Sequence, residues 1–150
     1  MWWFKPKYKE VNIYSDVDGK LTFAPTGISK PFNITKELDT TLKLPVPYSD
    51  DDLYATLQQA LDLCFSKRPT FHQNSSWSEA MHESKRRIKE SKGKKLVTFR
   101  WSKDDGYIVE ATERDKRGAY TVTEEISLGH KPEKSEIVAA IHKAFELSTC

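Results

Sequence analysis

The chain has 150 residues, of which 37% are hydrophobic and 31% charged, and its net charge is +2. This size and composition exclude a disordered or fibrous chain and fit a single domain over residues 1–150, with four Trp, seven Phe and six Tyr to fill its core. No apolar run approaches the roughly 20 residues of a membrane-spanning helix, and the stretch MWWFKPKYKE lacks the charge order of a secretory signal, so we expect a cytoplasmic protein without membrane contact.

The first half of the chain begins with a predicted β-hairpin over residues 8–24. VNIYS and KLTFA alternate apolar and polar residues, and DVDG between them predicts a tight turn. Turn chemistry explains Asp16 and Asp18 better than calcium does, because Lys20 stands where a third oxygen ligand would be needed. The following stretch ELDTTLKL predicts a strand with Leu38, Thr40 and Leu42 on one face, with a short helix as the alternative.

The first predicted helix follows Ser49, whose side chain suits an N-cap and which has Asp52 three residues later to complete a capping box. Asp50, Asp51 and Asp52 all fall in the first turn, where carboxylates face the positive end of the helix dipole. The apolar residues at helical spacing predict one buried face: Leu53, Leu57, Ala60, Leu61 and Cys64.

A second helix is predicted over residues 76–91, within a segment of strong positive charge. Residues 67–103 hold eleven Lys or Arg against three Glu. The spacing of four, three and four predicts that Trp77, Met81, Ser84 and Ile88 point inward, leaving His82, Lys85, Arg86 and Lys89 on the outer side, with Lys92 just beyond the end. Glu83 and Arg87 have the four-residue spacing of a favourable ion pair.

The last third of the chain predicts an antiparallel meander and a final helix. LVTFRW, YIVEAT and AYTVTEEISL are strand-like, and the links SKDDG and ERDKRG suit hairpin turns. Alternation predicts one mostly apolar sheet face: Val97, Phe99, Trp101, Tyr107, Val109, Ala111, Tyr120, Val122 and Ile126. A helix from Lys134 to about Ser148 would bury Ile137, Ala140, Ile141, Ala144 and Phe145. The order predicts an α+β fold, with a hairpin and a three-stranded meander packed against about three helices.

Catalytic and cofactor motifs are lacking in the sequence. The four His residues are far apart and no Cys-x-x-Cys pair exists, which argues against a zinc site, and no phosphate-binding glycine loop or nucleophile elbow is present. We therefore expect no enzymatic activity, no catalytic residues, no metal and no cofactor. His72, in the loop RPTFHQNSSW, is the first residue to substitute if an activity were sought.

Nucleic-acid binding is the alternative that the basic helix favours. Lys85, Arg86, Lys89 and Lys92 would form a stripe able to follow phosphates, although aromatic residues for base stacking are scarce within it. A solvated helix face explains the same residues.

The opening MWWFKPKYKEVNIYSD, the length and the α+β order resemble bacterial immunity proteins of contact-dependent growth inhibition systems. The resemblance implies a cytoplasmic protein that binds a cognate toxin domain, commonly a nuclease, as a 1:1 heterodimer and performs no catalysis itself. An interface with a basic nuclease cleft would use acidic groups and aromatic anchors, and these residues fit that description: Tyr48, Asp50, Asp51, Asp52 and Tyr54. Helix capping and packing explain the same residues, and the basic segment would instead meet an acidic surface on the toxin.

Overall fold

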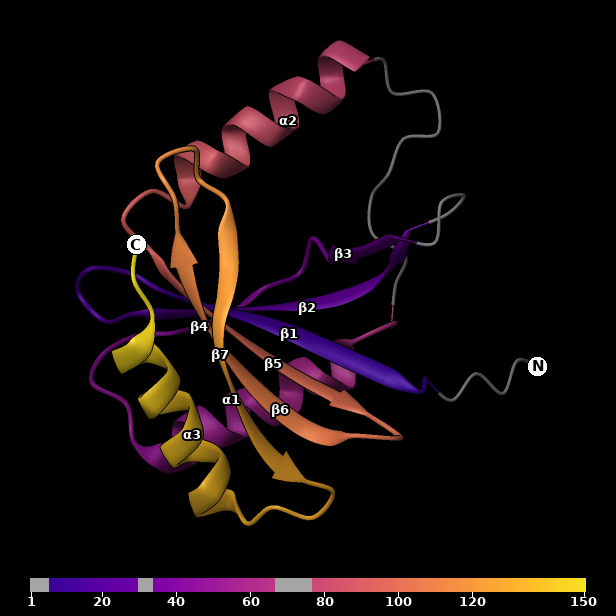
Figure 1. The fold of residues 1–150 in the computed structure, drawn as a ribbon, viewed down its shortest axis with the longest axis vertical. Coiled ribbons are helices and arrows are strands. Elements are labelled where there is room, and N and C mark those ends of the chain that lie inside the picture. The colour runs from indigo at the N-terminus through magenta and orange to yellow at the C-terminus, as the bar shows by residue number, and fades with distance from the viewer. Residues whose placement is uncertain (1–5, 30–33, 67–76) are drawn as a thin grey trace.

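The computed structural model describes residues 6–29, 34–66 and 77–150, which form a seven-stranded antiparallel sheet and three helices (Figure 1). The predicted α+β fold is confirmed. The sheet order is β3-β2-β1-β5-β6-β7, with β4 also pairing with β2. The strands are β1 (Tyr8–Ser15), β2 (Leu21–Ser29), β3 (Ile34–Glu37), β4 (Leu42–Leu44), β5 (Lys95–Ser102), β6 (Gly106–Arg114) and β7 (Tyr120–Gly129). Among the described residues, no helix is both long enough and apolar enough to cross a membrane.

The hydrophobic core lies on one face of the sheet, under helices α1 (Asp50–Leu63) and α3 (Lys134–Leu147). Alternate residues of the strands point into it, so that Val11, Ile13, Phe23 and Phe99 are fully buried. The helices add the faces predicted from their spacing, which include Leu53 and Leu57 from α1, Cys64 at its C-cap, and Ile137, Ala140 and Ile141 from α3. Because the core occupies this one face, the opposite face of the sheet is free to carry polar residues.

Helix α1 begins with the predicted capping box. The backbone amide of Asp52 donates to the Ser49 hydroxyl, and the amide of Ser49 donates to the Asp52 carboxylate, both at 3.1 Å. Two amides that the helix itself leaves unpaired are thus satisfied.

The predicted hairpin is confirmed in β1 and β2, and β2 runs on through Pro25 and Gly27 to Ser29. The strand predicted for ELDTTLKL is wrong in part, because only its first residue, Glu37 at the end of β3, and Leu42–Leu44 (β4) are in strands, and both strands pair with the same edge of β2. Between them Leu38 is buried, and its amide donates to the Pro25 carbonyl at 2.8 Å. Residues 38–41 are not in a strand, so the pairing along this edge of β2 is interrupted there.

The prediction for the face of β7 is also wrong in part. Ala111 pairs with Glu124 but the next residue, Thr112, pairs with Val122, so β7 carries a bulge at Thr123. An extra residue reverses the alternation beyond it. Ile126 therefore packs against the core, whereas Val122 is 45% exposed.

Helix α2 (Trp77–Glu90) exists as predicted and its basic residues are exposed, but the prediction that its apolar stripe points inward is wrong. Met81 and Ile88 are 41% and 39% exposed, and Ser84 is exposed too, while the side chain of Trp77 lies outside the described part. The helix projects over the sheet face that α1 and α3 leave uncovered (Figure 1). That face is mostly polar, and α2 turns charged residues toward it, with Ile88 beside Gly118 of the link between β6 and β7.

Candidate functional site

A groove of about 600 Å³ lies on the sheet face opposite the core, beneath α2. Its floor comes from alternate residues of β1 and β2, including Glu10, Asn12 and Tyr14, which point away from Val11 and Ile13. One wall is the edge formed by β3 and β4, and α2 is the other wall and roof. The basic residues of the lining outnumber the acidic ones: Lys36, Lys43, Arg86, Arg87 and Lys94 stand against Glu10, Glu37 and Glu90.

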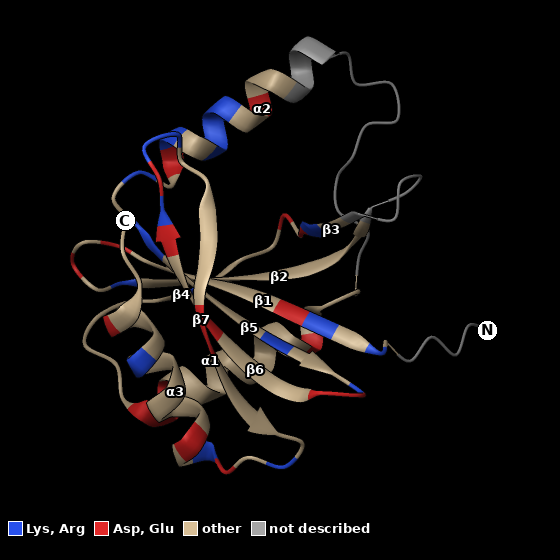
Figure 2. Ribbon diagram, viewed as in Figure 1, with Lys and Arg blue, Asp and Glu red and all other residues tan. Residues whose placement is uncertain are grey.

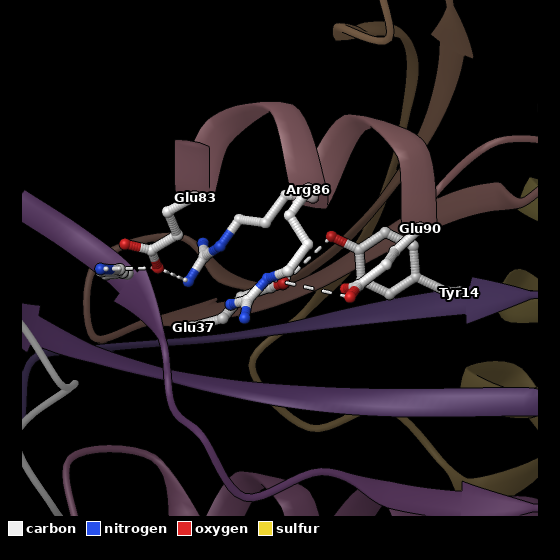
Figure 3. Close-up of polar contacts among 7 residues, drawn as sticks. Tyr14, Glu37, Glu83, Arg86 and Glu90 are labelled. Carbon is white, nitrogen blue, oxygen red and sulfur yellow. Dashed lines mark hydrogen bonds and ion pairs between the residues drawn. The ribbon is translucent and has the colours of Figure 1, made fainter. Parts of the chain in front are cut away.

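The centre of the groove holds a hydrogen-bonded pair from two strands. The hydroxyl of Tyr14 on β1 donates to the Glu37 carboxylate on β3, with distances of 3.1 and 3.0 Å to its two oxygens. Figure 3 shows both side chains below α2, from which Glu83, Arg86 and Glu90 project toward them. Sheet pairing through β2 brings these two residues together although 23 positions separate them.

Burial raises the pKa of Glu37 above its ordinary value of 4.5, because a charged carboxylate loses its hydration there. The hydrogen bond from Tyr14, the charge of Arg87 and a hydrogen bond from Asn12 act in the opposite direction without cancelling that rise. The pKa of Tyr14 is raised as well, first by burial and then by the neighbouring Glu37. The groove thus contains a carboxyl group that holds its proton more tightly than an exposed one.

Ion pairs connect the roof to the wall. Glu83 of α2 lies 3.0 Å from Arg87, as predicted from their spacing, and 3.4 Å from Lys36 of β3. Arg86 lies 3.8 Å from Glu90 along the helix. The two pairs within the helix are exposed, and each of them contributes at most about 1 kcal/mol. Charge contacts of this kind position the helix without fixing it as firmly as a packed apolar face would.

The C-terminal end of α2 is anchored by two side chains of the β6–β7 hairpin. Arg114 donates to the Ile88 carbonyl at 2.8 Å, and the Tyr120 hydroxyl donates to the carbonyls of Lys94 at 2.7 Å and Ser91 at 3.2 Å. Tyr120 also meets Tyr14 edge to face, with ring centres 6.2 Å apart. The bulge at Thr123 is what turns Tyr120 to this side of the sheet.

The predicted acidic interface lies at the junction of α1 with α3, on the core side of the sheet. Asp50 is 3.3 Å from His142, Asp51 pairs with Lys134, and Asp52 completes the capping box. The Lys134 ammonium also lies 5.6 Å from the centre of the Tyr54 ring, and Tyr48 packs partly buried against the core. These five residues lie together at the start of α1, and the structure gives each of them an internal partner.

The predicted basic stripe is exposed along its whole length, at Lys85, Arg86, Lys89 and Lys92. Figure 2 shows the basic residues along α2. Arg86 is the member of the stripe that lines the groove, whereas the three lysines do not. His72, the residue singled out for a possible activity, lies outside the described residues, and within these no three His, Cys, Asp or Glu side chains form a metal-binding group.

The groove itself was not foreseen from the sequence, although a signal for it exists. The polar members of the alternating β1 segment, Glu10, Asn12 and Tyr14, mark a second sheet face that is not apolar. Glu37 and Lys36 carry no such signal, because only the pairing of β3 with β2 places them across β2 from β1.

Comparison with known proteins shows the fold alone. No protein-family model matches the sequence, and no curated protein gives a significant match. Among solved structures, a similar one is the protein of unknown function NMB0488 from Neisseria meningitidis, with a TM-score of 0.68, 13% sequence identity and coverage of 99% of both chains. The two proteins thus share the same overall fold.

Proposed function

We propose that this protein is an immunity protein that neutralises a cognate toxin domain, of the nuclease type, by forming a 1:1 complex with it in the cytoplasm. The proposal combines the resemblance of the N-terminal sequence to immunity proteins of contact-dependent growth inhibition systems with a surface suited to protein binding. It involves no catalysis, cofactor or metal.

The observation that carries the proposal is the exposure of large apolar side chains on a charged, projecting helix. Met81 and Ile88 of α2 have about two fifths of their surfaces open to solvent. A partner protein that covered them would gain the free energy of removing apolar surface from water, about 25 cal/mol per Å². Ile88 also packs beside Gly118 of the β6–β7 hairpin, so a partner would cover the part of its surface that remains exposed.

The first test is protection. The gene immediately upstream is expected to encode a large secreted protein whose C-terminal domain is toxic, and expression of the present chain alone should protect cells that produce that domain. Mixing the two purified proteins should give one species with the mass of a 1:1 heterodimer by light scattering. Absence of both protection and complex would refute the proposal.

A second candidate function, nucleic-acid binding, is favoured by the exposure of Lys85, Arg86, Lys89 and Lys92 along one helix. Phosphate contacts of this kind lose affinity steeply as salt concentration rises. Filter binding of single- and double-stranded RNA and DNA at two salt concentrations tests it, with Arg86→Glu and Lys89→Glu as the charge-reversal variant. Affinity that ignores both salt and the substitutions would exclude this function.

A further inference from the structure

We propose that the toxin domain docks on the outer face of α2, defined by Met81, Lys85, Ile88, Lys89 and Lys92, and that it meets this face with an acidic surface containing an apolar patch. The inference rests on the proposed function and adds to it the interface and the chemistry of the partner. It replaces the acidic cluster at the start of α1 as the expected contact site.

Helical geometry separates the two sides of α2. Met81 and Ile88 are seven residues apart, which is two turns and about 10 Å along the axis, so they point to the same side. Lys85 and Lys89 fall within the same half of the helix, and Lys92 lies in the turn that follows it. The residues that point to the groove lie in the other half: Glu83, Arg86, Arg87 and Glu90. The outer face is therefore distinct from the groove.

The charge of this face is uncompensated. Within the described part of the chain, no carboxylate lies within ion-pair distance of Lys85, Lys89 or Lys92. The Glu side chains that could have paired with them, Glu83 and Glu90, lie on the groove side and contact Arg87, Lys36 and Arg86 instead. Three exposed lysines next to two exposed apolar side chains fit a partner surface with negative charge around an apolar patch.

The apolar residues favour a protein over a nucleic acid as the partner. Binding of single strands depends on aromatic side chains for base stacking, and none of the five residues of the outer face is aromatic. Met81 is unbranched and adapts its shape to a partner's pocket, as methionine does at many protein-binding surfaces. A nuclease toxin would then be covered through an acidic region outside its phosphate-binding cleft.

The face is presented on a supported helix, which lowers the entropic cost of docking. Arg114 and Tyr120 hold the C-terminal end of α2, and Ile88 rests against Gly118 of the β6–β7 hairpin while remaining 39% exposed. The ion pair between Glu83 and Lys36 holds the helix about two turns before its last residue, Glu90. Docking therefore needs little rearrangement of this half of α2.

The test measures binding of the purified toxin domain encoded upstream by surface plasmon resonance at low and high salt. The variant Lys85→Glu with Lys89→Glu should bind about 30-fold more weakly than the wild type, mainly through slower association, and should lose most of the salt dependence. The matched control is Lys103→Glu with Lys131→Glu, which changes the same charge at two exposed loop positions at the other end of the sheet. Circular dichroism verifies that each variant is folded.

A second pair of variants tests the apolar contribution. Met81→Gln with Ile88→Gln should accelerate dissociation, whereas Val17→Gln, at a position 93% exposed in the β1–β2 turn, should leave it unchanged. If the wild type binds and both outer-face variants bind equally well, the inference fails while the proposed function stands. Loss of RNA or DNA binding in the lysine variant with unchanged toxin binding also overturns it. If the wild type does not bind the toxin domain, the proposed function fails and the inference with it.

Discussion

Glu37 is a carboxyl group that the fold removes from water and places under a helix rich in arginine. Its pKa is raised because burial outweighs the hydrogen bond from Tyr14 and the charge of Arg87. The folded protein then binds a proton more tightly at this site than the unfolded chain does. Stability is therefore lost as the pH rises from the ordinary Glu value of 4.5 through the raised value in the folded state.

Replacing Glu37 with Gln removes this dependence, because the amide is neutral at every pH and its oxygen still accepts the Tyr14 hydroxyl. The variant should gain free energy of unfolding relative to the wild type as the pH rises from about 4 to 7, and the gain should vanish at the acid end. Urea denaturation across this range measures it, with exposed Glu146→Gln as the control for loss of one charge. Parallel pH profiles for Glu37→Gln and wild type would show that burial does not govern this carboxyl group.

Two glycines with nearly equal φ angles allow backbone strain to be separated from crowding. Gly106 and Gly129 have φ of +74° and +73°, but a Cβ on Gly106 would lie 2.3 Å from the Gly129 carbonyl oxygen, whereas a Cβ on Gly129 meets nothing within 4 Å. We expect Gly129→Ala to cost about 1 kcal/mol of unfolding free energy and Gly106→Ala about 3 kcal/mol. Thermal denaturation compares them, and equal losses would mean that the crowding relaxes.

Helix α2 shows at the scale of one element what a sequence pattern can and cannot predict. Its existence and limits follow from spacing and composition, and the Glu83–Arg87 pair follows from four-residue spacing. The side that the helix turns toward the domain cannot be predicted in this way, because an apolar stripe has the same spacing whether it is packed into a core or exposed. Met81 and Ile88 were expected inside for that reason and are found outside.

The same limit applies to the candidate site. Capping at Ser49 and the buried face of α1 depend on residues close in sequence and were predicted correctly. The Tyr14–Glu37 pair depends on strand order, and hairpin signals specify which strands are neighbours in sequence but not where β3 attaches. The β7 bulge likewise has no signal in the alternation of AYTVTEEISL.

Substitution of Tyr120 tests how the C-terminal end of α2 is held. Tyr120→Phe keeps the ring but removes the hydroxyl that donates to the Ser91 and Lys94 carbonyls, which should cost about 1 kcal/mol and speed hydrogen exchange of the amides of residues 88–94. Tyr107→Phe is the matched control, since within the described chain its hydroxyl has no hydrogen-bond partner. Unchanged exchange in Tyr120→Phe would assign the anchoring to Arg114 alone.

For the whole molecule, stability is concentrated on the core side of the sheet. Leu57→Ala, at a fully buried position, should lower the free energy of unfolding by about 2–5 kcal/mol. Met81→Gln with Ile88→Gln should change it by less than about 1 kcal/mol, because both side chains are already exposed. Chemical denaturation measures the contrast. A large loss in the α2 variant would show that these residues serve packing.

The bulge at Thr123 makes the two parts of β7 turn their side chains to opposite faces of the sheet. The segment before it, with Tyr120, supports the roof, and the segment after it, with Ile126, belongs to the hydrophobic interior. Substitutions in the first segment can therefore re-aim the helix above without disturbing the packing below. A scaffold partitioned in this way lets the surface around α2 diversify over generations while the interior stays the same.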